Sequence, residues 1–193
     1  CRTGNKARGV TGQANPIGDP FDIDYVAHEM GHQFGANHTF NGSTGSCTSN
    51  RVASCAYEPG SGVTVMAYAG ICAPQNIAPN SIDIFHTKSF DEIIAYSVSG
   101  SGNGCAVKVN TGNAVPVPTV PAGGWVIPRN TPFKLVGSAT DGNASDVLSY
   151  CWEQYDLGPA GAPNSPSGTA PIFRDFVPKA TGERVFPQWS DIV

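Results

Sequence analysis

Residues 28–38 read His28-Glu29-Met30-Gly31-His32-Gln33-Phe34-Gly35-Ala36-Asn37-His38, which is the pattern H-E-x-x-H-x-x-G-x-x-H. On a helix, His28 and His32 lie one turn apart, so both imidazoles can hold one metal ion. Gly35 can end that helix in a left-handed conformation, which brings His38 back to the same ion. Three neutral imidazoles suit Zn²⁺ and leave one tetrahedral position open for water. Glu29, beside the first ligand, can then take a proton from that water.

The residues before this motif predict where its helix begins. Asp19 is a suitable N-cap, Pro20 suits the first helical position, and Asp22 places an acid in the first turn. At about 100° per residue, one stripe is apolar and the opposite side is polar. The apolar stripe comprises Ile23, Val26, Ala27, Met30 and Phe34, and the opposite side comprises Tyr25, His28, Glu29 and His32. We therefore expect one face of the helix in the core and the other at the metal site.

The motif resembles that of the metzincin zinc peptidases. A lone H-E-x-x-H arises by chance, but the added Gly and third His at these offsets make coincidence improbable. Metzincins also carry a Met-containing turn beneath the metal, and Val65-Met66-Ala67-Tyr68 follows at a plausible distance. The resemblance implies a Zn²⁺ cofactor, protein or peptide substrates, and peptide-bond hydrolysis with Glu29 as general base. It also implies that Met66 forms an apolar floor under the imidazoles.

Within the metzincins, the chain is most similar to the reprolysin-like, adamalysin-type branch. In that branch a Cys and a short strand precede the zinc helix, and Cys1 and residues 8–11 match them. The substrate-binding edge strand lies upstream of that Cys, so we expect it, with the rest of the N-terminal sheet, to be missing here. Thr39-Phe40, directly after the third His, resembles the pappalysin-like branch instead.

Tyr68 lies two residues after Met66, as a Tyr does in the astacin branch. The resemblance implies that its phenol reaches the metal or donates to the oxyanion of the transition state. The alternative is a Tyr in the wall of the site with its hydroxyl in solvent.

Six cysteines, none of them in a C-x-x-C pair, favour disulfides in an oxidising, extracellular compartment. Resemblance to reprolysins implies that Cys1 pairs with Cys105, and Cys47 with Cys72 is the second expected bridge. Cys55 and Cys151 are left without assigned partners, and a third bridge stays open.

The rest of the chain predicts an α+β protein with two parts. Ser89-Phe90-Asp91-Glu92 is a capping box that begins a short amphipathic helix ending near Gly100, similar to the closing helix of a metzincin catalytic subdomain. We assign residues 1–107 to the zinc-peptidase core and residues 108–123 to a linker. His86 lies in the loop before that helix, where a structural role is expected.

Residues 124–193 are expected to form a partial all-β module. Short strands are predicted at residues 125–127, 133–136 and 147–152. Residues 138–142 and the pair Tyr150-x-Trp152 resemble immunoglobulin-like modules appended to secreted bacterial enzymes, with Trp152 in the core. The chain stops before such a sandwich would close, so we expect the module to be truncated. Asp141 and Asp146 could bind Ca²⁺, although solvated turn acids are the better interpretation.

Composition excludes several other functions. The net charge is −4 and only 13% of the residues are charged, so nucleic-acid binding is not expected. No apolar run is long enough to span a membrane. The chain begins with Cys1 and shows no signal peptide, so we expect a monomeric piece of a larger secreted precursor.

Two alternatives to a peptidase stay open at this point. In the first, zinc only braces a catalytically silent fragment. The expected open coordination position and Glu29 argue against this, and the missing N-terminal sheet argues for it. In the second, the protein is an extracellular adhesion or binding module that acts through residues 114–193.

Overall fold

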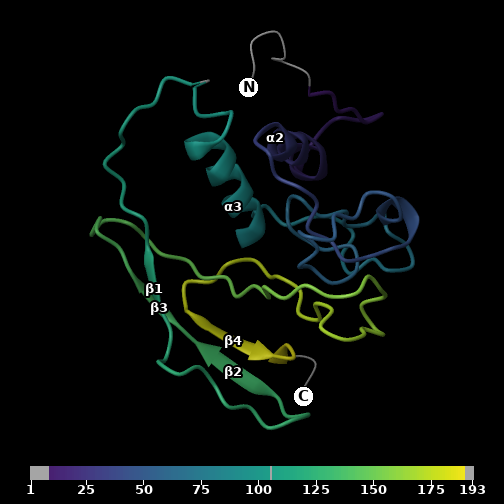
Figure 1. Cartoon of the computed structure of the whole chain (residues 1–193), viewed down its shortest axis with the longest axis vertical. Coiled ribbons are helices and arrows are strands. Elements are labelled where there is room, and N and C mark those ends of the chain that lie inside the picture. The colour runs from purple at the N-terminus through teal and green to yellow at the C-terminus, as the bar shows by residue number, and fades with distance from the viewer. Residues whose placement is uncertain (1–8, 105, 190–193) are drawn as a thin grey trace. The chain divides into compact units, whose positions relative to one another are not determined.

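The computed structural model describes residues 9–104 and 106–189, and it mixes helix and sheet as the α+β prediction requires (Figure 1). The chain forms two compact units, which are described separately below. The first comprises Cys1–Val107 and Glu153–Val177, and the second comprises Lys108–Trp152 and Pro178–Val193. The first unit therefore includes residues 153–177, which lie inside the range 124–193 predicted as one module.

The metal-motif helix is built from three consecutive pieces, α1 (Asp19–Phe21), a π-helical stretch (Asp22–Ala27) and α2 (His28–Gln33). The residues at both joins keep right-handed helical dihedral angles, so the helix is continuous. Its N-cap is Gly18 and not the predicted Asp19, because the Gly18 carbonyl accepts from the amides of Phe21 and Asp22. At the other end, Gly35 has a φ of 91°, as its predicted role in the turn requires.

The predicted apolar stripe of this helix is buried only in part. Ile23 and Ala27 pack against the core formed by Ala36, Val65 and Met66. Met30 and Phe34 are 54% and 46% exposed, so the prediction that they lie in the core is wrong. The helix is rotated so that Gly31 faces Met66, which turns the neighbouring Met30 away from the core.

The long connection after His38 has little regular structure, but a backbone bridge and a disulfide hold it in place. Phe40 and Glu58 form an isolated parallel bridge, and a short 3₁₀ helix follows at Gly45–Cys47. Cys47 and Cys72, one of the expected pairs, form a disulfide. A loop of this length with little regular structure is held here by backbone pairing and one covalent bond.

Helix α3 (Thr87–Ile94) continues as a π-helical stretch at Ala95–Ser99 and ends at Gly100, as predicted. Its start differs from the predicted capping box at Ser89. His86 is the N-cap, and its Nδ1 accepts from the amide of Lys88 at 3.0 Å. Ser89 is instead buried within the first turns. Ile93 packs against the core that contains Met66, so α3 and the metal-motif helix share one apolar cluster.

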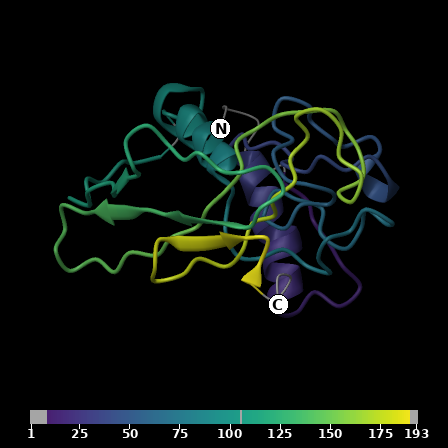
Figure 2. The ribbon, with the colours of Figure 1, turned by 90° about the horizontal axis from the view of Figure 1, so that it is seen from below.

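In its described residues, the second unit contains two antiparallel pairs of strands. In one, β1 (Val117–Thr119) pairs with β3 (Ser138–Thr140), and in the other, β2 (Phe133–Val136) pairs with β4 (Glu183–Phe186), as Figure 2 shows for the green and yellow arrows. The strand predicted at 133–136 is confirmed. The one at 125–127 is wrong, and residues 147–152 contribute only an isolated bridge between Tyr150 and Lys179. A strand persists only where a partner satisfies its backbone, and residues 125–127 have no such partner among the described residues.

Four further expectations concern a second disulfide, a short strand, a membrane span and the immunoglobulin-like module. Cys1 and Cys105 lie outside the described residues, so their pairing stays a prediction. Residues 9–11 are not in a strand, contrary to expectation. In the ranges that the structure describes, no helix is long and apolar enough to cross a membrane. The immunoglobulin-like interpretation of the second unit also stays a prediction.

Candidate metal centre

The three motif histidines converge on one point. The Nε2 atom of His38 lies 3.0 Å from that of His32 and 3.3 Å from that of His28. Tetrahedral zinc with Zn–N bonds of about 2.0–2.1 Å would separate its nitrogen ligands by about 3.3 Å. The observed spacings therefore match the ligand spacing of a tetrahedral zinc site.

Each of the three rings is oriented by a backbone carbonyl. The Nδ1 atoms donate to carbonyl oxygens, His28 to Val65 at 2.7 Å, His32 to Ala36 at 2.8 Å and His38 to Asn50 at 2.7 Å. A carbonyl oxygen can only accept, so each Nδ1 carries the hydrogen and each Nε2 presents a lone pair. The lone pair of His38, 3.0 Å from Nε2 of His32 and 3.3 Å from that of His28, is repelled by theirs unless a cation lies between them. The donor set therefore fits a metal ion.

The surroundings of His28 and His38 keep these two rings neutral, which is the form that binds metal. Burial lowers the pKa of His28 to about 4, partly offset by the Val65 carbonyl, and His32 adds a repulsion in the same direction as burial. Burial likewise lowers the pKa of His38 to about 4, against the opposing effect of the Asn50 carbonyl. These two imidazoles are therefore unprotonated at neutral pH.

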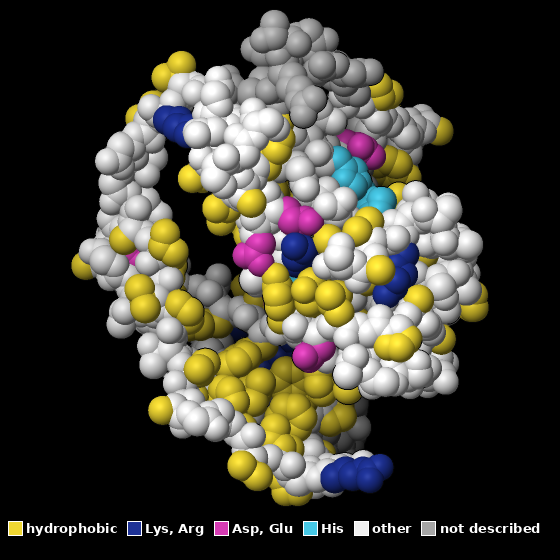
Figure 3. Space-filling view, in the orientation of Figure 1, with side chains coloured by type: hydrophobic (Ala, Val, Ile, Leu, Met, Phe, Trp, Pro, Cys, Tyr) yellow, Lys and Arg dark blue, Asp and Glu magenta, His cyan; other side chains and the backbone are white. Residues whose placement is uncertain are grey.

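Glu29 and Tyr68 lie beside the histidines. The Tyr68 ring centroid is 4.5 Å from that of His38 and 5.6 Å from that of His28. Burial raises the pKa of Tyr68, and the charge of Glu29 raises it further, so the phenol keeps its proton. In Figure 3, histidine side chains (cyan) reach the surface next to an acidic side chain (magenta). The centre is therefore open to solvent on this face.

Comparison with known proteins gives one match. The model of a family described as metallo-peptidase family M12B, reprolysin-like, matches residues 1–97, which hold all three histidines and Met66. The chain belongs to the reprolysin-like M12B metallopeptidase family. No curated protein and no solved structure matches it. Family membership and the group of three histidines together fit a zinc peptidase.

In this reprolysin-like chain, Met66 packs against the metal-motif helix at Gly31. It is fully buried, and a Cβ added at Gly31 would lie 2.3 Å from its Sδ. The preceding residue, Val65, supplies the carbonyl that orients His28. Val65 and Met66 therefore both contact the metal-motif helix.

One contact that the sequence did not suggest joins α3 to the reprolysin-like motif. Glu92 accepts from the backbone amide of Asn37 at 2.8 Å and from its side-chain amide at 2.9 Å. The thiol of Cys55 donates to the same carboxylate at 3.2 Å, and Cys55 forms no disulfide within the described ranges. Because these partners are 37 and 55 positions apart, no local pattern could have revealed them.

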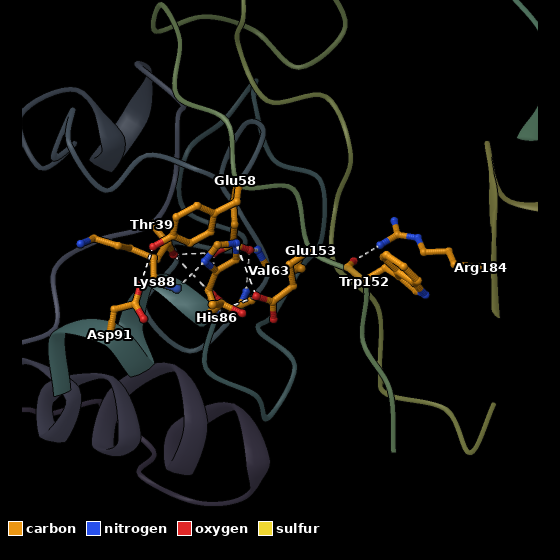
Figure 4. Close-up of polar contacts among 12 residues, drawn as sticks. Thr39, Glu58, Val63, His86, Lys88, Asp91, Trp152, Glu153 and Arg184 are labelled. Atoms are coloured by element: carbon orange, nitrogen blue, oxygen red, sulfur yellow. Dashed lines mark hydrogen bonds and ion pairs between the residues drawn. The ribbon is translucent and has the colours of Figure 1, made fainter. Parts of the chain in front are cut away.

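Residues 153–177 supply further support to the same unit. The amide of Thr87 donates to Glu153 at 2.6 Å, and Glu153 lies 3.7 Å from Nε2 of His86, which Figure 4 shows. Arg51, which follows the carbonyl that orients His38, donates to the Gly158 carbonyl at 3.1 Å. The expected structural role of His86 agrees with its complete burial.

Proposed function

We propose that this protein is a secreted, zinc-dependent endopeptidase that cleaves proteins or peptides. One observation carries the proposal: three imidazole Nε2 atoms converge at tetrahedral spacing while backbone carbonyls hold every Nδ1. The open face of the centre and the adjacent Glu29 support a catalytic site over a structural one, because structural zinc sites are closed by a fourth protein ligand.

His28, His32 and His38 would hold the zinc ion. When bound, zinc acts as a Lewis acid that polarises the substrate carbonyl and makes a water molecule more acidic. Glu29 accepts a proton from the attacking water and delivers it to the leaving amine. The protonated phenol of Tyr68 donates to the developing oxyanion.

Two neighbouring features fit this role. We propose that residues 65–68 are the Met-turn, with Met66 as an apolar floor that keeps water away from the back of the imidazoles. The Cys47–Cys72 disulfide is typical of proteins in an oxidising compartment, which supports an extracellular enzyme.

The test is cleavage of casein and of internally quenched peptides by the full chain, with zinc and after chelation. We expect chelation to abolish cleavage and zinc to restore it. Glu29→Gln should retain zinc, because the three imidazoles are unchanged, and should lose on the order of 10²-fold or more in kcat. The exposed Asp83→Asn is the matched control and should keep full activity.

Three outcomes would contradict the proposal. Zinc binding without any cleavage would favour the zinc-braced, catalytically silent alternative. Unchanged turnover in Glu29→Gln would show that another group handles the proton. Binding of glycans or cell surfaces by an inactive chain would favour the adhesion module formed by residues 114–193.

A further inference from the structure

We propose that Glu58 is a positioning residue of the metal centre, whose carboxylate fixes the chain after the third histidine to the chain that orients the first. The inference rests on the zinc site of the proposed function. Glu58 is 1% exposed and lies in the connection between the motif helix and the proposed Met-turn. No sequence pattern singled it out.

The carboxylate of Glu58 is surrounded by hydrogen-bond donors. Its Oε1 accepts from the amides of Val63 at 2.7 Å and Thr64 at 3.0 Å. Its Oε2 accepts from the Thr64 hydroxyl at 2.6 Å and from the Thr39 hydroxyl. Figure 4 shows Thr39, Glu58 and Val63 joined in this cluster. All four partner groups belong to buried residues, so water does not replace them.

These contacts join two segments that carry the orienting groups of the centre. Thr39 directly follows His38, and its amide donates to the Met66 carbonyl at 3.2 Å. Thr64 directly precedes Val65, whose carbonyl orients His28. Glu58 also pairs through its backbone, donating to the Thr39 carbonyl at 2.9 Å. The Glu58 side chain thus links the backbone next to His38 to the backbone that carries the Val65 carbonyl, which orients His28.

The backbone around Glu58 is shaped to admit the carboxylate. Gly62 has a φ of 66°, and a Cβ there would lie 3.1 Å from Cδ of Glu58 and 2.6 Å from Cβ of Ala67. This left-handed glycine turns the next two amides toward one oxygen, as in an anion-binding nest. Gly62 therefore lies at a position where the backbone must come close to the Glu58 carboxylate and where φ is positive.

Neutralising this carboxylate changes the donor–acceptor balance. In Glu58→Gln, the remaining oxygen can serve the two amides, but the new NH₂ group faces two hydroxyl groups that also need an acceptor. Buried donors left without a partner are costly, so the Thr39 and Thr64 segments would move apart to find other partners. The carbonyl of Val65 and the ring of His38 would move with them.

The experiment measures zinc affinity by competition with a chromogenic chelator, together with the visible spectrum of the Co²⁺-loaded protein. We expect Glu58→Gln to bind zinc about 10–100-fold more weakly and to show an altered Co²⁺ spectrum, since losing groups that orient metal ligands has effects of this size. Thr39→Val should weaken binding in the same direction, and Thr39→Ser, which keeps the hydroxyl, should restore it. The exposed Glu183→Gln is the matched control and should leave both readouts unchanged.

A purely structural role predicts a different result. In that case, Glu58→Gln and Thr39→Val would lower the unfolding temperature of the metal-free protein while zinc affinity and the Co²⁺ spectrum stay at wild-type values, and this would overturn the proposal. If Glu58→Gln fails to fold, Thr39→Val and Thr39→Ser decide the question alone. None of these readouts uses cleavage. A wild-type protein that binds zinc without cleaving peptides therefore contradicts the peptidase and leaves this test valid.

Discussion

Gly31 and Met66 pack so closely that a Cβ on Gly31 would lie 2.3 Å from Sδ of Met66 and 3.1 Å from the ring of Phe85. Gly31 lies between the two helical histidines, where alanine would otherwise favour the helix by up to about 1 kcal/mol. The glycine is therefore required by the contact between the helix and the stretch 65–68. Because Met66 is fully buried, a side chain added at position 31 would push it against the residues that pack around it.

Gly31→Ala should lower the free energy of unfolding by about 1–2 kcal/mol, because overpacking at Met66 outweighs the gain in helix propensity. In a Met66→Ala background the same change should become neutral or stabilising. Urea unfolding of the four proteins measures this coupling. Gly12→Ala, where nothing lies within 4 Å, is the control. Additive effects of the two substitutions would contradict the contact.

The metal ligands could be predicted from the sequence because the information is local. His28, His32 and Gly35 are placed by helix geometry alone, and the turn at Gly35 returns His38 to the same point. The groups that orient them were not predictable. The carbonyls of Val65 and Asn50 lie 37 and 12 residues from their histidines, and any residue type can supply a backbone carbonyl.

Two sequence predictions failed because another residue formed the expected contact: His86 caps α3, and Gly31 packs against Met66. The capping box at Ser89 is a valid start signal, but the imidazole of His86 caps the helix one turn earlier. The stripe that includes Met30 satisfies helical periodicity, yet the helix packs through its glycine instead. Periodicity identifies an apolar side but does not tell which part of it contacts a partner.

Glu92 should contribute stability that depends on pH. Burial alone would raise its pKa, but the hydrogen bonds from Asn37 and Cys55 and the charge of Lys88 lower the pKa below its ordinary value of 4.5. The ionised form is therefore favoured by folding. The resulting stability is present above pH 4.5 and is lost as the pH falls through the lowered pKa.

Glu92→Gln should consequently be less stable than the wild type by about 1 kcal/mol near neutral pH, and this difference should shrink in acid. Urea unfolding of both proteins across a pH series measures it. Glu183→Gln, a change at an exposed carboxylate, is the comparison. A difference between Glu92→Gln and wild type that stays constant with pH would argue against the ionised contact with Asn37.

Gly158→Ala tests whether residues 153–177 belong to the metal-binding unit. A Cβ at Gly158 would lie 2.2 Å from the amide nitrogen of Ala170, so the segment would have to shift away from its contact with Arg51. We expect a loss of about 1–3 kcal/mol in the zinc-dependent unfolding transition. Gly161→Ala, at a position with open space around it, should change stability by less than about 0.5 kcal/mol. A shift confined to a separate, zinc-independent transition would contradict the assignment.

Tyr68→Phe separates a catalytic phenol from a residue that only lines the site. The ring contacts with His38 and Phe40 remain in this variant, so zinc affinity and stability should change little. If the phenol donates to the oxyanion, kcat for peptide cleavage should fall on the order of 10²-fold while KM stays near the wild-type value, because the bond forms only in the transition state. Tyr155→Phe also removes one hydroxyl, but one that donates to Asp91 on α3, so it should leave kcat unchanged. Equal kcat values for Tyr68→Phe and wild type would place the Tyr68 hydroxyl in the wall of the site.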